Sequence, residues 1–385
     1  MAIQVFSPKY DIDACLSEIR ECFEVGWTGV GFKTVQFESD WKNYTGARNA
    51  YFLNSSTAGL NLACKIMKMK YEWFDDDEII TTPLTFISTN HAILKAGLKP
   101  VFADVDNTLC LSPKSVEQCI SNRTKAVMYV GIGGNPGHLG EIKQICENHN
   151  LKLILDAAHM AGTRINGKPL GEEGDATIFS FQAVKNLPTG DSGMLCFKED
   201  ELDNIARKMG WLGIDKDTYL RSDNGGSYKW KYDVEYVGNK YHGNSIMAAI
   251  AIVQLKHLDE DNEYRRELIQ QYKERLMKEG EKIKYVFIPE GVESSNHLFQ
   301  IIVKDRDELL LFLNENNIFP GVHYVDNTEY RMYKYAQGLC PRASWYSNHV
   351  LSLPLHLRLK TKDVDRVCEV IHTFLVNHPG EFVIP

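Results

Sequence analysis

Lys185 lies in surroundings that favour covalent chemistry at its amine. It follows a predicted strand, in Phe179-Ser-Phe-Gln-Ala-Val-Lys185-Asn-Leu, and its neighbours in the chain are apolar or small, with no acid to pair it. A lone lysine in a loop is usually solvated. Held among apolar groups, a lysine tends instead to have a lowered pKa, and the neutral amine is the form that builds a Schiff base. Lys185 is therefore a candidate nucleophile.

Asp156 and His159 follow another predicted strand, in Asp156-Ala-Ala-His159. A carboxylate next to buried apolar surface is costly unless a cation or a strong donor meets it. Asp156 could cap the following helix, or it could hold a protonated ring nitrogen of a flat ligand that the two small residues admit. His159, taken by itself, is better interpreted as a packing histidine.

A third polar group, Asn54-Ser-Ser56-Thr57-Ala58, precedes a predicted helix. Ser56 or Thr57 is a natural N-cap, because a side-chain oxygen there can accept a bond from an unpaired amide. The same free amides and the positive end of the helix dipole also favour a bound phosphate. Both interpretations stay open from these residues alone.

The elements around these groups predict a mainly parallel sheet covered by helices on both faces. Continuous apolar runs alternate with helix-period segments between about residues 50 and 200, which is typical of such a sheet. Ligands of open parallel sheets bind at the carboxyl ends of the strands, where the three polar groups lie. The predicted strands are Glu78–Thr82, Pro100–Val105, Lys125–Gly131, Leu151–Ala157, Ala176–Phe181 and Met194–Lys198, and the helices include Ala58–Met69, Thr89–Leu94 and Leu139–His149.

The composition of the chain and its pattern of apolar residues change beyond about residue 215. Residues 216–240 are polar and aromatic and predict a long excursion, followed by a helix over Ser245–Leu276. The last hundred residues resemble an α+β unit. We expect a large α/β domain over residues 1–245 and a smaller α+β domain over 246–385. The elements expected in the second are Leu298–Val303, Leu309–Asn316, Gly321–Tyr324 and Lys362–Val376.

Composition excludes several classes of protein. The 385 residues are 44% hydrophobic and 24% charged with a net charge of −8, which argues against a nucleic-acid or anionic-membrane surface. Nine cysteines without framework spacing indicate a reducing compartment. We see no secretory signal and no apolar run that could span a bilayer, so we expect a cytoplasmic protein.

Three other motifs resemble known functional patterns only in part. Gly131-Ile-Gly133-Gly134-Asn-Pro136 approaches a dinucleotide-binding fingerprint but has proline at its last position, so an NAD-dependent oxidoreductase is a remote alternative. Gly190-Asp-Ser192-Gly-Met lacks the last glycine of a nucleophile elbow. The twelve histidines show no metal-ligand spacing, and we expect no metal.

Together, the ordered blocks resemble the DegT/DnrJ/EryC1/StrS aminotransferases, a branch of the fold type I enzymes that use pyridoxal 5'-phosphate (PLP). The resemblance runs from about residue 26 to 371. Besides the three groups above, it rests on Gly26-Trp-Thr-Gly-Val-Gly, Asp77-Glu-Ile-Ile-Thr-Thr-Pro-Leu-Thr-Phe86, Lys99-Pro-Val-Phe-Ala-Asp-Val-Asp106, Gly321-Val-His-Tyr324 and Val350-Leu-Ser-Leu-Pro-Leu. It implies a large domain with a mainly parallel seven-stranded sheet between helices, and a smaller C-terminal domain.

The resemblance assigns roles to residues of this chain. Lys185 resembles the lysine that carries PLP and moves the proton, and Asp156 the partner of the pyridine nitrogen. Phe86 resembles the aromatic residue that stacks on the ring. The other cofactor contacts implied are His159 near the ring, with Ser56, Thr57 and Ser180 at the phosphate, and the implied substrate contacts are Thr28, His323 and Tyr324.

One departure from the family pattern concerns a residue expected to reach across a subunit interface. The family often has Gly-Tyr-Asn-Tyr-Arg, in which the asparagine contacts the cofactor phosphate of the neighbouring subunit. Here the string is Gly238-Asn-Lys240-Tyr-His242. Our hypothesis is that Lys240 replaces the amide with a point charge on that phosphate, or contacts the substrate diphosphate. Asp191 and Ser192 replace a glutamate and a glycine of the family, with no evident consequence.

The function implied is ping-pong transamination by a homodimer with active sites at the interface. L-glutamate would donate the amino group to a nucleotide-linked keto-deoxy sugar, first a 4-keto-6-deoxy hexose, in surface-polysaccharide, O-antigen or related deoxyaminosugar biosynthesis. The alternatives are a 3-keto-6-deoxy sugar, or a PLP-dependent sugar dehydratase of the same fold. Lys185 argues against the dehydratase, because those relatives have histidine at its position.

Overall fold

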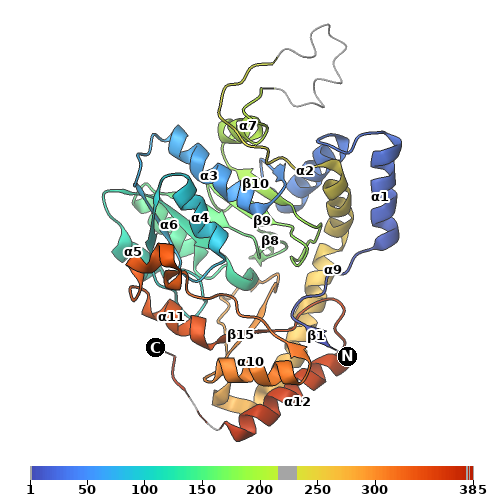
Figure 1. Cartoon of the computed structure of the whole chain (residues 1–385), viewed down its shortest axis with the longest axis vertical. Coiled ribbons are helices and arrows are strands. Elements are labelled where there is room, and N and C mark those ends of the chain that lie inside the picture. Colours follow the sequence, from blue (N-terminus) through green and yellow to red (C-terminus); the bar gives the residue numbers. More distant parts are fainter. Residues whose placement is uncertain (1, 216–231, 379, 381, 385) are drawn as a thin grey trace.

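The computed structural model describes residues 2–215, 232–378, 380 and 382–384 (Figure 1). Residues 216–231, which form most of the excursion expected between residues 216 and 240, lie outside the described part. Within the described residues, no helix is long and apolar enough to cross a membrane.

A seven-stranded sheet forms the centre of the fold, with the strand order β2-β10-β9-β6-β5-β3-β4. Strand β10 runs antiparallel to both neighbours, and the others run parallel to one another. This confirms the predicted α/β fold with a mainly parallel seven-stranded sheet. The short strand β2 was not among the predicted runs. The strands are β2 (Tyr51–Leu53), β3 (Glu78–Thr81), β4 (Lys99–Phe102), β5 (Thr124–Val130), β6 (Lys152–Asp156), β9 (Ala176–Ser180) and β10 (Gly193–Phe197).

Helices cover both faces of this sheet because its strands are apolar on both sides. Ile178 packs with α3, α4 and α7 on one face, whereas the next residue, Phe179, packs with α2, α6 and the start of α9 on the other. The helices of this part are α1 (Ile12–Glu24), α2 (Phe32–Thr45), α3 (Ser56–Lys70), α4 (Ile87–Lys95), α5 (Pro113–Cys119), α6 (Leu139–Asn148), α7 (Asp200–Met209) and α9 (Ser245–Leu276).

A second, smaller core lies in the C-terminal part of the chain. An antiparallel sheet of β11 (Lys284–Tyr285), β13 (Phe299–Ile302) and β15 (Val350–Leu353) packs against the end of α9 and against α10 (Arg306–Glu315) and α12 (Thr361–Asn377). Gly321 adds only an isolated bridge to Ser352, in place of the element expected at 321–324. The remaining helices and turns are α11 (Pro341–His349), η1 (Ile132–Gly134), η2 (Met277–Lys282), η3 (Asn327–Glu329) and η4 (Arg331–Ala336).

Two features join the N-terminal and C-terminal parts. Strand β1 (Ile3–Gln4) pairs with β14 (Ile318–Phe319), so the first residues of the chain lie beside the smaller core. Helix α9 runs along the side of the molecule and contacts α1 and α2 as well as α12 (Figure 1). The division at residue 245 therefore stays a prediction. A further small sheet is formed by β7 (Arg164–Ile165), β8 (Lys168–Pro169) and β12 (Val292–Glu293).

Phe179 offers a test of the packing between the central sheet and α2. Its ring is fully buried and lies 4.9 Å from the ring of Trp41, edge to face. We expect Phe179→Ala to lower the free energy of unfolding of the apoprotein by about 3–5 kcal/mol, because the lost aromatic ring leaves a cavity. Phe179→Leu, which keeps most of the volume, should cost roughly 1–1.5 kcal/mol. Urea unfolding followed by tryptophan fluorescence checks both, and equal losses would contradict this packing.

Candidate active site

A cavity of about 420 Å³ opens beside the carboxyl ends of β6 and β9 and the start of α3. It brings together most of the residues that the sequence predicts for the site. Those that line it are Ser56, Thr57, Phe86, Asp156, His159, Ser180, Lys185, His323 and Tyr324. The C-terminal part of the chain contributes the last wall of the cavity, through residues 297, 323 and 324.

Lys185 and Asp156 influence each other electrostatically inside this cavity. Burial lowers the pKa of Lys185 to about 8, and the negative charge of Asp156 opposes that shift. Burial raises the pKa of the Asp156 carboxyl, while the charge of Lys185 counteracts the rise. The residues next to Lys185 in the sequence offer no acid, but the fold supplies one from β6. A larger share of the Lys185 amine is therefore neutral near pH 8 than for an ordinary lysine.

The carboxylate of Asp156 is held in a fixed orientation. Thr89 Oγ1 donates to Asp156 Oδ2 at 2.7 Å, and the amide of Ala158 donates to Oδ1 at 3.1 Å. Both bonds favour the ionised carboxylate. Each oxygen keeps a further lone pair, so Asp156 can meet a cationic donor inside the cavity. The amide of Ala158 lies two residues after Asp156, so Asp156 makes a local turn as well as lining the site.

The start of α3 presents free amides to the same cavity. Ser55 is the N-cap residue, and its side chain accepts a bond from the amide of Ala58 at 3.1 Å. The expectation that Ser56 or Thr57 forms the cap is therefore wrong by one residue, because the helix already begins at Ser56. The first amides of a helix have no intrahelical acceptor, so those of Ser56 and Thr57 remain for an anion.

Strand β10 passes close to this helix start. A Cβ atom at Gly193 would lie 2.6 Å from the backbone nitrogen of Ser56, so the approach requires glycine. The adjacent residues Asp191 and Ser192 line the cavity, and the Ser192 hydroxyl lies 2.6 Å from that of Thr189. The close approach fixes the helix start against the sheet.

His159 is more than a packing histidine. The backbone amide of Gly133 donates to its Nδ1 at 3.1 Å, and its Nε2 lies 3.1 Å from the hydroxyl of Tyr324. Because the amide can only donate, Nδ1 must accept and a neutral ring carries its proton on Nε2. Burial and the charge of Lys185 lower the pKa of His159 well below its usual value, so the ring is neutral.

The glycines that resemble a dinucleotide-binding fingerprint have a different role here. Gly133 and Gly134 adopt φ angles of +64° and +94°, and a Cβ at Gly134 would lie 2.3 Å from the hydroxyl of Ser295. The glycines therefore admit the C-terminal part of the chain at close range and orient His159. The glycine motif therefore no longer supports the alternative of an NAD-dependent oxidoreductase.

Sequence reasoning missed several residues that line the cavity. Phe6 comes from the N-terminal segment, and His297 from the loop before β13. Thr89 was predicted only as part of a helix, although its hydroxyl orients Asp156. No local signal marks Phe6 or His297 as functional, since their positions depend on long-range packing. The other lining residues that were not predicted are Ser55, Thr85, Ser88, Val130, Ala158, Gln182 and Val184.

Two of the predicted site residues do not line the cavity of this chain. The Lys240 amine lies over the indole ring of Trp211, 5.5 Å from its centroid, and its backbone carbonyl accepts a bond from Asn54. Thr28 is exposed, and its carbonyl accepts a bond from the amide of Ser245. The phosphate contact implied for Lys240 would therefore have to be made in the cavity of a partner subunit. The contact implied for Thr28 would require a substrate that extends beyond this cavity or lies in the cavity of a partner subunit.

The residues present fit PLP. A lysine with a lowered pKa is available for covalent attachment, and an oriented carboxylate is available for a ring nitrogen. Phe86 offers a flat surface that is 58% exposed, and the start of α3 with Ser180 offers donors for a phosphate. Among the described residues, no group of three or more histidine, cysteine, aspartate or glutamate side chains is arranged to hold a metal ion.

Comparison with known proteins supports the same chemistry. Residues 10–372 match the sequence profile of the DegT/DnrJ/EryC1/StrS aminotransferase family. The chain is 35% identical over 368 residues to the spore coat polysaccharide biosynthesis protein SpsC of Bacillus subtilis (strain 168), covering 92% of this chain and 93% of SpsC.

Two solved structures have the same fold over almost their whole length. The aminotransferase TlmJ from Streptoalloteichus hindustanus is 29% identical with a TM-score of 0.90, over 98% of this chain and 100% of TlmJ. The PLP-form of Spr1654 from Streptococcus pneumoniae, for which a sugar aminotransferase activity is proposed, is 25% identical with a TM-score of 0.88, over 98% and 99% of the two chains.

The lowered pKa of Lys185 predicts selective labelling of its amine. Only the neutral amine attacks trinitrobenzenesulfonate, so labelling of Lys185 in the apoprotein should rise with pH, with a midpoint near 8, and then level off. Ordinary lysines should continue to gain reactivity toward about pH 10.4. Asp156→Asn should move the midpoint to lower pH, because the negative charge that favours the protonated amine is removed. Site-resolved mass spectrometry measures this, and a Lys185 profile parallel to that of the other lysines would contradict the assignment.

Proposed function

Because the chain belongs to the DegT/DnrJ/EryC1/StrS aminotransferase family and is a PLP-dependent sugar aminotransferase, we propose that it moves an amino group from L-glutamate to a nucleotide-linked 4-keto-6-deoxy hexose. The observation that carries the proposal is that Lys185 and Asp156 line one cavity, where the charge of each acts on the pKa of the other. The similarity to SpsC, named for its part in polysaccharide biosynthesis, supports a product used in a surface polysaccharide or a related deoxyaminosugar.

Each residue of the site has a separate role in the proposed reaction. PLP, when bound, supplies an electron sink for the carbon that loses its proton. Lys185 binds the cofactor covalently and, as a neutral amine, takes and returns that proton at its Nζ. Asp156, oriented by Thr89 and the Ala158 amide, holds the proton on the ring nitrogen. Phe86 would stack on the ring, and His159 would lie near it.

The phosphate and the substrate occupy the two ends of the cavity in this proposal. Ser56, Thr57 and Ser180 would hold the phosphate, and the amides at the start of α3 would stabilise its charge. His323 and Tyr324, from the C-terminal part, contact the sugar. The nucleotide would bind farther from the reacting carbon and position the ketone. Thr28, which does not line the cavity of its own chain, stays a proposed contact to the sugar.

We further propose a homodimer that completes each site. Phe86 is 58% exposed although it lines the cavity, and α1 exposes Ile12, Leu16 and Phe23 by 66%, 56% and 64%. Exposed apolar side chains at this density are typical of an interface. Lys240 lies outside the cavity of its own chain, which agrees with a role in the site of the partner.

The central test is an absorbance spectrum of the purified holoenzyme. The wild type should show a visible band of bound PLP that L-glutamate bleaches, whereas L-alanine and L-aspartate should bleach it slowly. Lys185→Ala should lack the covalent band with PLP alone and lose more than about a thousandfold in activity. Lys185→Arg, which keeps the positive charge but replaces the lysine amine, is the matched control for Lys185→Ala. Absence of a band after PLP is added would contradict the cofactor assignment.

A panel of keto sugars tests the substrate. After glutamate is removed, the aminated enzyme is mixed with 4-keto-6-deoxy and 3-keto-6-deoxy hexoses linked to dTDP, UDP or GDP. We expect a 4-keto compound to restore the visible band fastest, with the amino sugar identified by mass spectrometry and NMR. Faster restoration by a 3-keto compound would contradict the proposed carbon and leave the transamination intact.

A mixed dimer tests the role of Lys240. Lys240→Ala should weaken affinity for PLP or for the nucleotide sugar by about tenfold, since an ionic contact to a phosphate is lost, and Lys240→Arg should weaken it less. A dimer of one Lys185→Ala chain and one Lys240→Ala chain should keep one fully functional site if Lys240 acts across the interface. Unchanged affinities in Lys240→Ala would contradict any role in binding.

A further inference from the structure

His297 is a buried imidazole that the proposed reaction does not yet use. It lies in the loop before β13, is 4% exposed, and lines the cavity together with Lys185. Its ring stacks on Phe6 at 5.3 Å and lies 4.3 Å from the ring of His159. The His297 side chain therefore packs against two rings and borders the cavity that contains Lys185.

The hydrogen bonds of Asn186 fix the tautomer of His297. The Asn186 side-chain nitrogen lies 2.7 Å from the carbonyl oxygen of Ser295, which can only accept, so this atom is the NH₂ group. The remaining Oδ1 of Asn186 lies 3.0 Å from Nδ1 of His297 and must accept from it. Nδ1 of His297 therefore carries the proton, and its Nε2 carries a lone pair.

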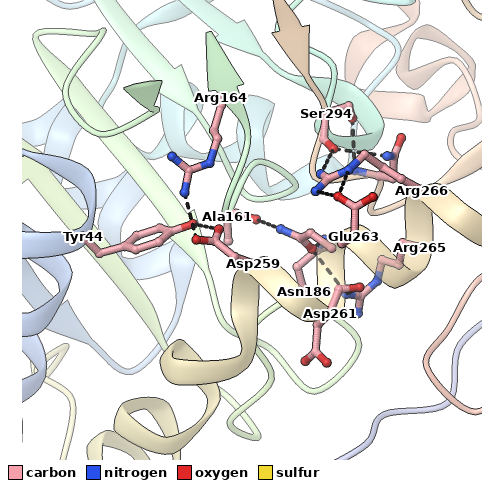
Figure 2. A network of polar contacts seen from close by, with 12 residues as sticks. Tyr44, Ala161, Arg164, Asn186, Asp259, Asp261, Glu263, Arg265, Arg266 and Ser294 are labelled. Atoms are coloured by element: carbon pink, nitrogen blue, oxygen red, sulfur yellow. Dashed lines mark hydrogen bonds and ion pairs between the residues drawn. The ribbon is translucent and has the colours of Figure 1, made fainter. Parts of the chain in front are cut away.

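This arrangement is anchored in a larger polar network on α9. The Asn186 NH₂ group also donates to Oδ1 of Asn262 at 2.7 Å, and the guanidinium of Arg265 lies 3.3 Å from the same oxygen. The NH₂ group of Asn262 donates to the carbonyl of Ala161 at 3.1 Å. Figure 2 shows Asn186, Arg265 and Ala161 in this network. Since each amide is oriented on both sides, Asn186 cannot rotate without breaking several buried bonds.

The lone pair on Nε2 of His297 belongs to a ring that stays neutral. Burial and the neighbouring charges lower the pKa of His297 well below its usual value, and His159 beside it is also neutral. Nε2 therefore accepts a hydrogen bond without taking the proton. Among the described residues, no group donates to it, and the ring borders the cavity.

The lone pair on Nε2 of His297 determines which chemical group can bind next to it. A carboxylate or a carbonyl would place a second acceptor against the lone pair, which is unfavourable. An ammonium group would meet the repulsive field of the protonated fraction of Lys185. A neutral hydroxyl satisfies the lone pair without either cost. In the proposed reaction Lys185 acts at the reacting carbon, so a hydroxyl that reaches His297 in the same cavity belongs to a neighbouring carbon.

We propose that His297 Nε2 accepts a hydrogen bond from the hydroxyl next to the keto group of the sugar, and so makes that hydroxyl a requirement for the substrate. The proposal rests on the proposed sugar transamination and adds a specificity-determining residue to it. Asn186 acts as a positioning residue, because it sets which nitrogen of His297 faces the sugar.

The experiment uses the holoenzyme and two forms of one substrate. These are the keto sugar that the wild type aminates in the panel above and the same compound with hydrogen in place of the adjacent hydroxyl. The wild type should prefer the hydroxylated sugar by about 10–100-fold in kcat/KM, because the deoxy compound leaves the lone pair unpaired. His297→Phe, which preserves the stacking on Phe6, should lose this preference. His297→Gln, which keeps a donor for Asn186 and an acceptor for the sugar, should retain part of it.

Controls separate this role from damage to the fold. His297→Phe should keep the visible PLP band, and its half-reaction with L-glutamate should lose less than its half-reaction with the hydroxylated sugar, since the proposed contact is made only to the sugar. Nitrogen NMR of the wild type should show His297 with its proton on Nδ1, and Asn186→Leu should abolish that preference.

Each remaining result counts against the proposal. Full discrimination between the two sugars in His297→Phe would overturn it, and so would an equal loss in both half-reactions, which would indicate a structural role. Turnover of no keto sugar by the wild type would overturn the proposed function itself. That failure would be evident before any His297 variant is made.

Discussion

The burial of an amine and a carboxylate in one cavity is the constraint on which the rest of the site depends. Removing either charge from water is costly, and the residues directly next to Lys185 and Asp156 in the sequence carry no opposite charge. The sheet resolves this by bringing the ends of β6 and β9 together, so that each charge opposes the pKa shift of the other. Bonds from Thr89 and the Ala158 amide stabilise the carboxylate further.

A second requirement follows from the first. The histidines around Lys185 must be neutral, because another positive charge would be unfavourable in the same buried space. Two histidines meet this condition with opposite tautomers. A backbone amide makes Nδ1 of His159 an acceptor, whereas Asn186 makes Nδ1 of His297 a donor. The cavity thus contains polar groups whose donor and acceptor atoms are set before any ligand binds.

Several glycines around the cavity have a role that their local sequence pattern does not indicate. Gly133 and Gly134 resemble a nucleotide-binding turn, but their positive φ angles allow Ser295 and His159 to approach. Gly193 lets β10 pass against the start of α3, which leaves the amides of that helix free. A glycine pattern shows that the backbone needs freedom at a position. Only the neighbouring elements show which contact uses that freedom.

The sequence by itself determined the order and type of most elements and the chemistry of the central residues. Apolar runs and helical periods depend on neighbours in the chain, so β3, β4, β5, β6, β9, β10 and α9 were predictable, and motifs indicated Lys185, Asp156 and Phe86. The antiparallel pairing of β2 with β10, the placement of Phe6 and His297, and the tautomers of the two histidines were not predictable. Each arises from contacts between segments far apart in the chain, and only the packed fold selects among the partners that such residues could have.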